Sequence, residues 1–115
     1  MSYLKLSEGF LREAKEALAR FKQTKDETSL RQACEKGFGA FAQALMHYKG
    51  RELHHREFRE VVEKLYVKTK NRDIEYAYGL AEALHASFYN GDLPYLFVED
   101  YLKKIEEGIE AIRSL

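Results

Sequence analysis

Residues 80–93 read LAEALHASFYNGDL, and this stretch decides the fold. Ala81, Leu84 and Phe88 recur every three or four residues, which is the spacing of one apolar face of a helix. Gly91 ends the pattern, because glycine readily adopts the left-handed backbone that follows many helix C-termini. We therefore expect a helix here whose three apolar residues belong to a core.

The same helical period recurs on both sides of this stretch. Each predicted helix has one apolar stripe, and helices of this kind bury their stripes best against each other. No Pro-, Gly- or Ser-rich linker interrupts the chain. We predict an all-α fold, an antiparallel up-and-down bundle of about five helices in a single domain over residues 1–115. The predicted helices span Tyr3–Lys22, Glu27–Tyr48, His55–Thr69, Asp73–Asn90 and Pro94–Arg113.

Polar residues and a proline mark where the predicted helices begin. Asp26 or Thr28 caps the second helix, because a short polar side chain accepts hydrogen bonds from unpaired N–H groups of the first turn. Asp73 caps the fourth helix in the same way. Pro94 suits the first turn of the fifth helix, where its missing N–H is not needed.

Small residues on two of the helices predict a close contact. Such residues let two helix axes approach to the short end of the usual packing distance. We therefore expect the second helix to pack closely on the fourth. The residues concerned are Ala33, Gly37, Ala40 and Ala44 on the second helix, and Ala77 and Ala81 on the fourth.

Composition indicates a globular protein of 115 residues with a formal net charge of zero. No run of residues is long and apolar enough for a membrane span, and no signal peptide precedes the first helix, so we expect a cytoplasmic protein. Abundant Lys and Glu with scarce Cys and Asn are typical of a thermophile. Residues 47–72 hold eight basic and four acidic side chains, a net charge of +4. This segment favours a solvated helix face, with a polar binding surface or a self-complementary dimer as alternatives.

The sequence lacks the common short catalytic motifs. It contains no phosphate-binding GxxxxGK[ST], no GxGxxG, no HExxH and no cysteine pair. Cys34 lies on an apolar stripe, where a thiol stays protonated and unreactive. We predict no catalytic residue, no cofactor and no metal site.

A basic cluster at the start of the third helix is the first candidate site. Guanidinium groups suit phosphate oxygens, so this cluster favours phosphate or nucleotide binding. A metal ion would need additional ligands, such as His47 or Glu52, because neighbouring histidines on a helix point about 100° apart; a polar helix start is the simpler alternative. The cluster comprises Arg51, His54, His55, Arg56 and Arg59.

A row on the fourth helix is the second candidate site. Tyr78, Glu82, His85 and Tyr89 are spaced by four, three and four residues, so they share one flank beside the core stripe. A histidine between phenols and a carboxylate could line a cleft or transfer protons near neutral pH. The alternative is that His85 is a packing residue at the border of the core.

The chain resembles the PaREP group of small archaeal helical proteins, which is itself similar to the HEPN superfamily of nucleotide-binding domains. Four segments carry the resemblance: SEGFLREAKEAL (residues 7–18), ACEKGFGAFAQALMHY (33–48), ALHASFYNGDL (83–93) and VEDYLKKIEEGIEAI (98–112). The resemblance implies an up-and-down helical bundle, often a homodimer. It also implies either an RNase of toxin–antitoxin or defence systems, or a nucleotide-binding partner of a small nucleotidyltransferase.

The RNase branch carries an Arg followed, after four to six residues, by a His, and no Arg of this chain has a His at that spacing. The leading hypothesis is therefore a non-catalytic HEPN-like module that dimerises and binds a partner protein or a nucleotide. The alternatives are a metal-independent RNase that uses the 51–59 cluster or His85 in a nonstandard arrangement, and a purely structural bundle. RNA is a possible ligand, and no membrane partner is expected.

Overall fold

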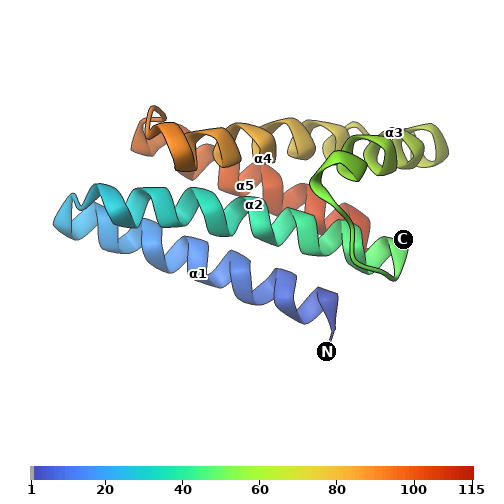
Figure 1. Cartoon of the computed structure of the whole chain (residues 1–115), viewed down its shortest axis with the longest axis horizontal. Coiled ribbons are helices and arrows are strands. Elements are labelled where there is room, and N and C mark those ends of the chain that lie inside the picture. The colour runs from blue at the N-terminus through green and yellow to red at the C-terminus, as the bar shows by residue number, and fades with distance from the viewer. Residues whose placement is uncertain (1) are drawn as a thin grey trace.

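The computed structural model describes residues 2–115, and within them the fold is all-α, as predicted. The elements run from the N-terminus to the C-terminus as a simple series of helices (Figure 1). They are α1 (Tyr3–Thr24), α2 (Glu27–Lys49), the short 3₁₀ helix η1 (His55–Glu57), α3 (Phe58–Thr69), α4 (Arg72–Asn90) and α5 (Tyr95–Arg113).

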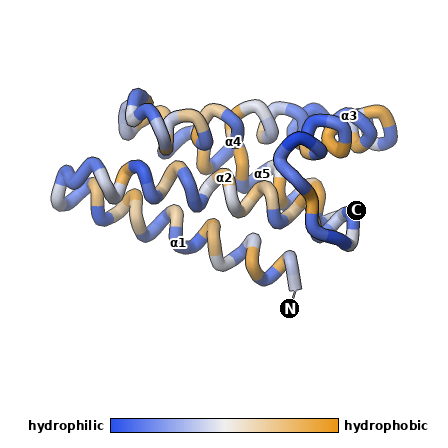
Figure 2. Tube along the Cα trace, in the orientation of Figure 1, coloured by the Kyte–Doolittle hydropathy of each residue, from blue (hydrophilic) through white to orange (hydrophobic). Residues whose placement is uncertain are grey.

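Four long helices make the body of the bundle. Helix α2 lies at its centre, because it packs against α1, α4 and α5, whereas α1 makes few contacts with α5. The 12-residue α3 packs against one end of α4 (Figure 1). The molecule is elongated, with extents of 42 × 27 × 22 Å. The loop between α2 and α3 is hydrophilic, and hydrophobic residues (orange) alternate with hydrophilic ones (blue) along each helix (Figure 2).

The observed helix starts confirm one prediction and correct two. Of the two caps considered for α2, Asp26 is the cap, since its Oδ1 accepts from the N–H of Thr28 at 3.1 Å. The predicted Asp73 cap of α4 is wrong. Asn71 takes that role, its Oδ1 accepting from the N–H of Asp73 at 2.8 Å, because an Asx side chain reaches the N–H two residues further on. Pro94 is the N-cap residue of α5 and not part of its first turn.

The third predicted helix divides into two parts. Residues 55–57 form η1, and the α-helix begins only at Phe58. The Glu57 carboxylate accepts from the N–H of His54 at 2.7 Å, and the N–H of Glu57 donates to the carbonyl of His54 at 2.9 Å. This local pairing tightens the first turn into a 3₁₀ helix.

The predicted stop of α4 is confirmed. Gly91 has φ +67° and its N–H donates to the carbonyl of Ser87 at 2.7 Å. Ala81 and Leu84 are fully buried, as expected, but Phe88 is only partly buried. Phe88 therefore belongs to the border of the core, where it bounds a surface hollow.

The predicted approach of α2 to α4 is confirmed at Gly37. An added Cβ there would lie 2.9 Å from Leu84 on α4 and 2.6 Å from Leu102 on α5, so both leucines fill the space that the glycine leaves. On the same helix, the backbone carbonyl of Ala40 accepts from the Ser7 hydroxyl of α1 at 2.7 Å. The sequence did not indicate a second close approach, between Gly108 on α5 and Ala77 on α4.

Across residues 2–115, no helix is both long and apolar enough to cross a lipid bilayer.

Candidate functional site

A histidine and a carboxylate from different parts of the chain meet at the centre of the candidate site. His55 in η1 and Glu82 on α4 lie with Nε2 2.8 Å from Oε1 and 2.9 Å from Oε2. A carboxylate can only accept, so Nε2 carries the proton and donates to Glu82. The contact orients the imidazole and leaves Nδ1 as its other polar atom. The His55 side chain is about half exposed.

The local structure explains why His55 reaches α4. Leu53 is 5% exposed and anchors the preceding loop in the core. The hydrogen bonds between His54 and Glu57 then fix the 3₁₀ turn in which His55 is the first residue. This position turns its side chain toward Glu82 on the flank of α4.

His85 extends the site along the same flank of α4. Its ring stacks on Phe38 of α2, with centroids 4.3 Å apart and an interplanar angle of 25°, and lies edge-on to His55 at 4.9 Å. Edge-to-face and offset arrangements of this kind are favourable for aromatic rings. His85 is only partly buried, so it both packs and faces outward. We call His55, Glu82, His85 and Phe38 the histidine cluster.

Tyr78 and Arg59 continue the flank beyond Glu82. Burial raises the pKa of Tyr78 above its ordinary value, and the nearby Glu82 carboxylate raises the pKa further, while Arg59 lowers it. The phenol therefore stays protonated at neutral pH. Arg59 is exposed and lies close enough to Tyr78 to bring a positive charge to this end of the row.

The structure divides the basic cluster predicted at the start of the third helix. His55 turns to α4, whereas Arg51 pairs with Glu57 at 3.2 Å and donates to the carbonyl of Glu52 at 3.0 Å. The His54 backbone supports η1 while its side chain is exposed, and Arg56 is exposed next to it. The second predicted row stays together, with Tyr78, Glu82 and His85 on one flank of α4 and Tyr89 edge-on to His85 at 5.3 Å. Two of the five residues of the basic cluster, His55 and Arg59, have thus joined the row on α4.

A hollow of about 210 Å³ adjoins the histidine cluster. His85 and Phe38 belong to its lining, so the hollow and the cluster share a wall. Phe10 of α1 lines it as well, and Phe88 and Tyr89 come from the last turns of α4. Tyr89 is 67% exposed, which leaves much of its ring uncovered. We call this hollow the aromatic slot.

Sequence reasoning did not identify Phe38 or Phe10 as site residues. Phe38 precedes Gly39 in the segment KGFGAF, and an added Cβ at Gly39 would lie 3.2 Å from the Phe10 ring. The glycine lets Phe10 lie close to α2. The available signal in the sequence was the position of Phe38 between two glycines of one helix. Which residues pack against Phe38 depends on which helix faces it, and the sequence does not specify that.

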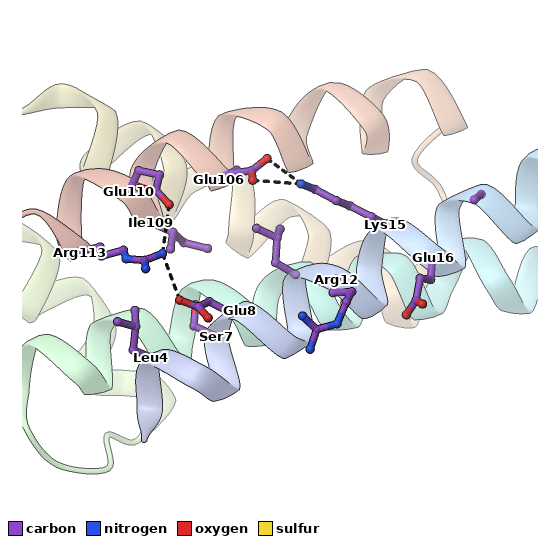
Figure 3. A pocket seen from close by; sticks show the side chains of 12 residues that line it. Leu4, Ser7, Glu8, Arg12, Lys15, Glu16, Glu106, Ile109, Glu110 and Arg113 are labelled. Carbon is purple, nitrogen blue, oxygen red and sulfur yellow. Dashed lines mark hydrogen bonds and ion pairs between the residues drawn. The ribbon is translucent and has the colours of Figure 1, made fainter. Parts of the chain in front are cut away.

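A larger hollow lies between α1 and α5. It measures about 500 Å³, and Leu4 and Ile109 are among the apolar residues that line it (Figure 3). Ion pairs cross it from Lys15 to Glu106 at 3.0 Å and from Arg113 to Glu8 at 3.1 Å (Figure 3). These opposite charges neutralise each other, no histidine lines the groove, and the hydroxyl of the buried Ser7 in its lining already donates to the Ala40 carbonyl. We therefore place the candidate site at the histidine cluster.

Two further predictions concern reactive groups. Cys34 is buried as expected, and burial raises the pKa of its thiol, so it is protonated and enclosed. Within the described residues 2–115, no three His, Cys, Asp or Glu side chains are arranged to hold a metal ion.

These features define the class of protein: a small all-α bundle with a half-exposed histidine–carboxylate pair beside an aromatic hollow. The chain matches the model of the archaeal PaREP1/PaREP8 family over residues 2–109, and it belongs to that family. The predicted PaREP membership is thereby confirmed, and the HEPN-like relationship stays a prediction. A search of curated proteins gave no match, and a search of solved structures gave none either.

Proposed function

We propose that this protein is a non-catalytic HEPN-like module that binds a nucleotide at the histidine cluster. The observation that carries the proposal is the hydrogen bond between His55 and Glu82 beside His85, next to the exposed Arg56 and Arg59. Guanidinium groups donate hydrogen bonds to phosphate oxygens. With Nε2 of His55 donating to Glu82, Nδ1 can donate to a phosphate oxygen in the form of the imidazole that is protonated on both nitrogens. The net charge of +4 over residues 47–72 favours the approach of an anion to this end of the molecule.

Calorimetric titration with AMP tests this proposal. The wild-type protein is expected to bind, and both His55→Ala and Arg59→Ala are expected to weaken binding roughly ten- to a hundredfold each, since a hydrogen bond to a charged group contributes roughly 1.5–3 kcal/mol. His54→Ala is the matched control, because the side chain of this neighbouring histidine lies outside the cluster. Equal losses of affinity in all three variants would mean that AMP binds at the loop between α2 and η1 and not at the histidine cluster. Absence of binding by the wild type would overturn the proposal.

We further propose that the protein acts as a homodimer with a protein partner, such as a small nucleotidyltransferase of a toxin–antitoxin or defence system. This part of the proposal comes from the resemblance to HEPN-like proteins. The exposed apolar side chains of Leu96 and Phe97 at the start of α5 support an intermolecular contact. Co-purification with the product of an adjacent nucleotidyltransferase gene would support the partner, and failure of the two purified proteins to associate would contradict it.

Metal-independent RNA cleavage is the second candidate function. A histidine oriented by a carboxylate, with a second histidine 4.9 Å away between ring centroids, is a set of groups suited to general acid–base catalysis. Cleavage of RNA in the presence of EDTA, lost in both His55→Ala and His85→Ala, would establish it. Intact RNA after incubation with the wild-type protein would exclude it.

A purely structural bundle is the remaining alternative. A ligand that binds only the folded state must raise the melting temperature. If AMP raises the melting temperature of the wild type but not of His55→Ala, the structural reading is excluded.

A further inference from the structure

The aromatic slot has the size and the aromatic lining of a site for one ring system. Its volume of about 210 Å³ is below the roughly 300–1,000 Å³ of pockets that enclose a whole drug-sized ligand. The slot therefore has room for part of a nucleotide, and the rest of the molecule would lie outside it. Phe10, Phe38, Phe88 and Tyr89 supply its aromatic surface.

The rings of the slot are held by protein contacts on some sides and uncovered on others. Phe38 is fixed by its stacking on His85 at 4.3 Å, and Phe88 lies edge-on to Tyr89 at 5.0 Å. Tyr89 is 67% exposed, so one side of this pair is accessible. A prearranged set of rings stacks a base without first losing side-chain freedom.

Charged groups join the aromatic rings in the lining of the slot. Lys36 and Glu35 are the charged residues of α2 that line it. The Lys36 ammonium lies 5.0 Å from the centroid of Phe10 and 3.4 Å from Glu13, so it is already held in place. A lining that combines aromatic rings with a few charged side chains matches the chemistry of a nucleobase, whose faces are apolar and whose edges form hydrogen bonds.

We infer that the aromatic slot takes the base of the nucleotide whose phosphate binds at the histidine cluster. This inference rests on the proposed function. His85 is the link between the two sites, since it lines the slot and lies 4.9 Å from His55 between ring centroids. Stacking is tolerant of base identity because every base has a π-face. The ligand class is thus a nucleotide, free or within a single strand, bound by base and phosphate together.

Titration with AMP, adenosine and ribose 5-phosphate separates the two sites. AMP is expected to bind the wild type more tightly than ribose 5-phosphate does. Tyr89→Ala is expected to weaken AMP binding about tenfold, the order of loss found when one stacking aromatic is removed, and to leave ribose 5-phosphate binding unchanged. Tyr76→Ala is the matched control, because Tyr76 is also an exposed tyrosine of α4, 57% exposed, and does not line the slot.

The outcomes distinguish this inference from the function on which it rests. Equal affinities for AMP and ribose 5-phosphate, unaffected by Tyr89→Ala, would overturn the base slot and keep a phosphate site. Binding of adenosine without binding of ribose 5-phosphate would support the slot and contradict the phosphate site. Both single-strand and free-nucleotide ligands are consistent with the slot, and a six-residue oligoadenylate decides between them: tighter binding than AMP indicates a strand, and weaker binding indicates a free nucleotide.

Discussion

At the scale of single residues, His85 is the residue whose interpretation the structure changes most. Its position on α4 left open whether it packs or participates in a site. The ring does both, because one face stacks on Phe38 while the residue as a whole is only partly buried. His55, and not its neighbour His54, is its partner in the cluster.

Glu57 is the residue whose charge supports the geometry of the site. The N–H of His54 donates to its carboxylate, and Arg51 lies 3.2 Å away; both contacts lower the pKa of Glu57 below its ordinary value of 4.5. A carboxyl group with a lowered pKa in the folded state stabilises that state above its unfolded pKa, and the stabilisation is lost as pH falls through the folded pKa.

We predict that Glu57→Gln lowers the melting temperature slightly near neutral pH and that this difference disappears below pH 4.5. Thermal unfolding followed by circular dichroism over this pH range measures the effect. Glu63→Gln is the control, because Glu63 is an exposed carboxylate of the adjoining helix α3. A difference between wild type and Glu57→Gln that stays constant at low pH would mean that the ionised carboxylate is not the cause.

At the scale of the helices, two glycines of similar sequence context have opposite surroundings. Gly37 of α2 lies against Leu84 and Leu102, whereas nothing lies within 4 Å of an added Cβ at Gly79 of α4. Glycine inside a helix costs roughly 0.8–1.0 kcal/mol relative to alanine. Close packing explains why glycine is needed at Gly37, and no packing contact requires it at Gly79.

We predict that Gly37→Leu destabilises the protein by about 1–3 kcal/mol, the usual cost of overpacking a core. Gly79→Leu is expected to leave the stability unchanged or to raise it by up to about 1 kcal/mol through helix propensity. Denaturant unfolding of both variants measures the difference. Equal stabilities of Gly37→Leu and wild type would show that α2, α4 and α5 do not pack as described.

At the scale of the whole molecule, the bundle leaves apolar side chains uncovered. Leu96 and Phe97 are 68% and 53% exposed, and Phe97 stacks on Tyr101 with centroids 6.4 Å apart. Contiguous exposed apolar groups of this kind mark interaction surfaces more often than isolated ones do. In the proposed dimer, these side chains would form the contact between two copies of the chain.

We predict that the protein is a dimer of two 13.5 kDa chains at micromolar concentration, measured by light scattering. Phe97→Glu is expected to shift the population to monomer, because a charge at an apolar interface loses its hydration. Val67→Glu, at an exposed position of α3, is the control. A wild-type mass of one chain would contradict the dimer.

The helices and most of the core follow from local sequence alone. Ala81, Leu84 and Gly91 have the predicted roles because periodicity and helix termination are decided by residues a few positions apart. The wrong predictions at the helix starts also concern residues only a few positions apart. Asn71 and Asp73 are both good caps, and the choice between them depends on backbone geometry that spacing does not specify.

The candidate site required the tertiary structure. His55 and Glu82 are 27 positions apart, and Phe10 and Phe38 belong to two other helices. Periodicity indicates which face of a helix is apolar, but not which helix covers it or how far a short turn such as η1 rotates a side chain. The packing of α1, α2 and α4 therefore decided that parts of two separate candidate clusters form one site beside an aromatic hollow.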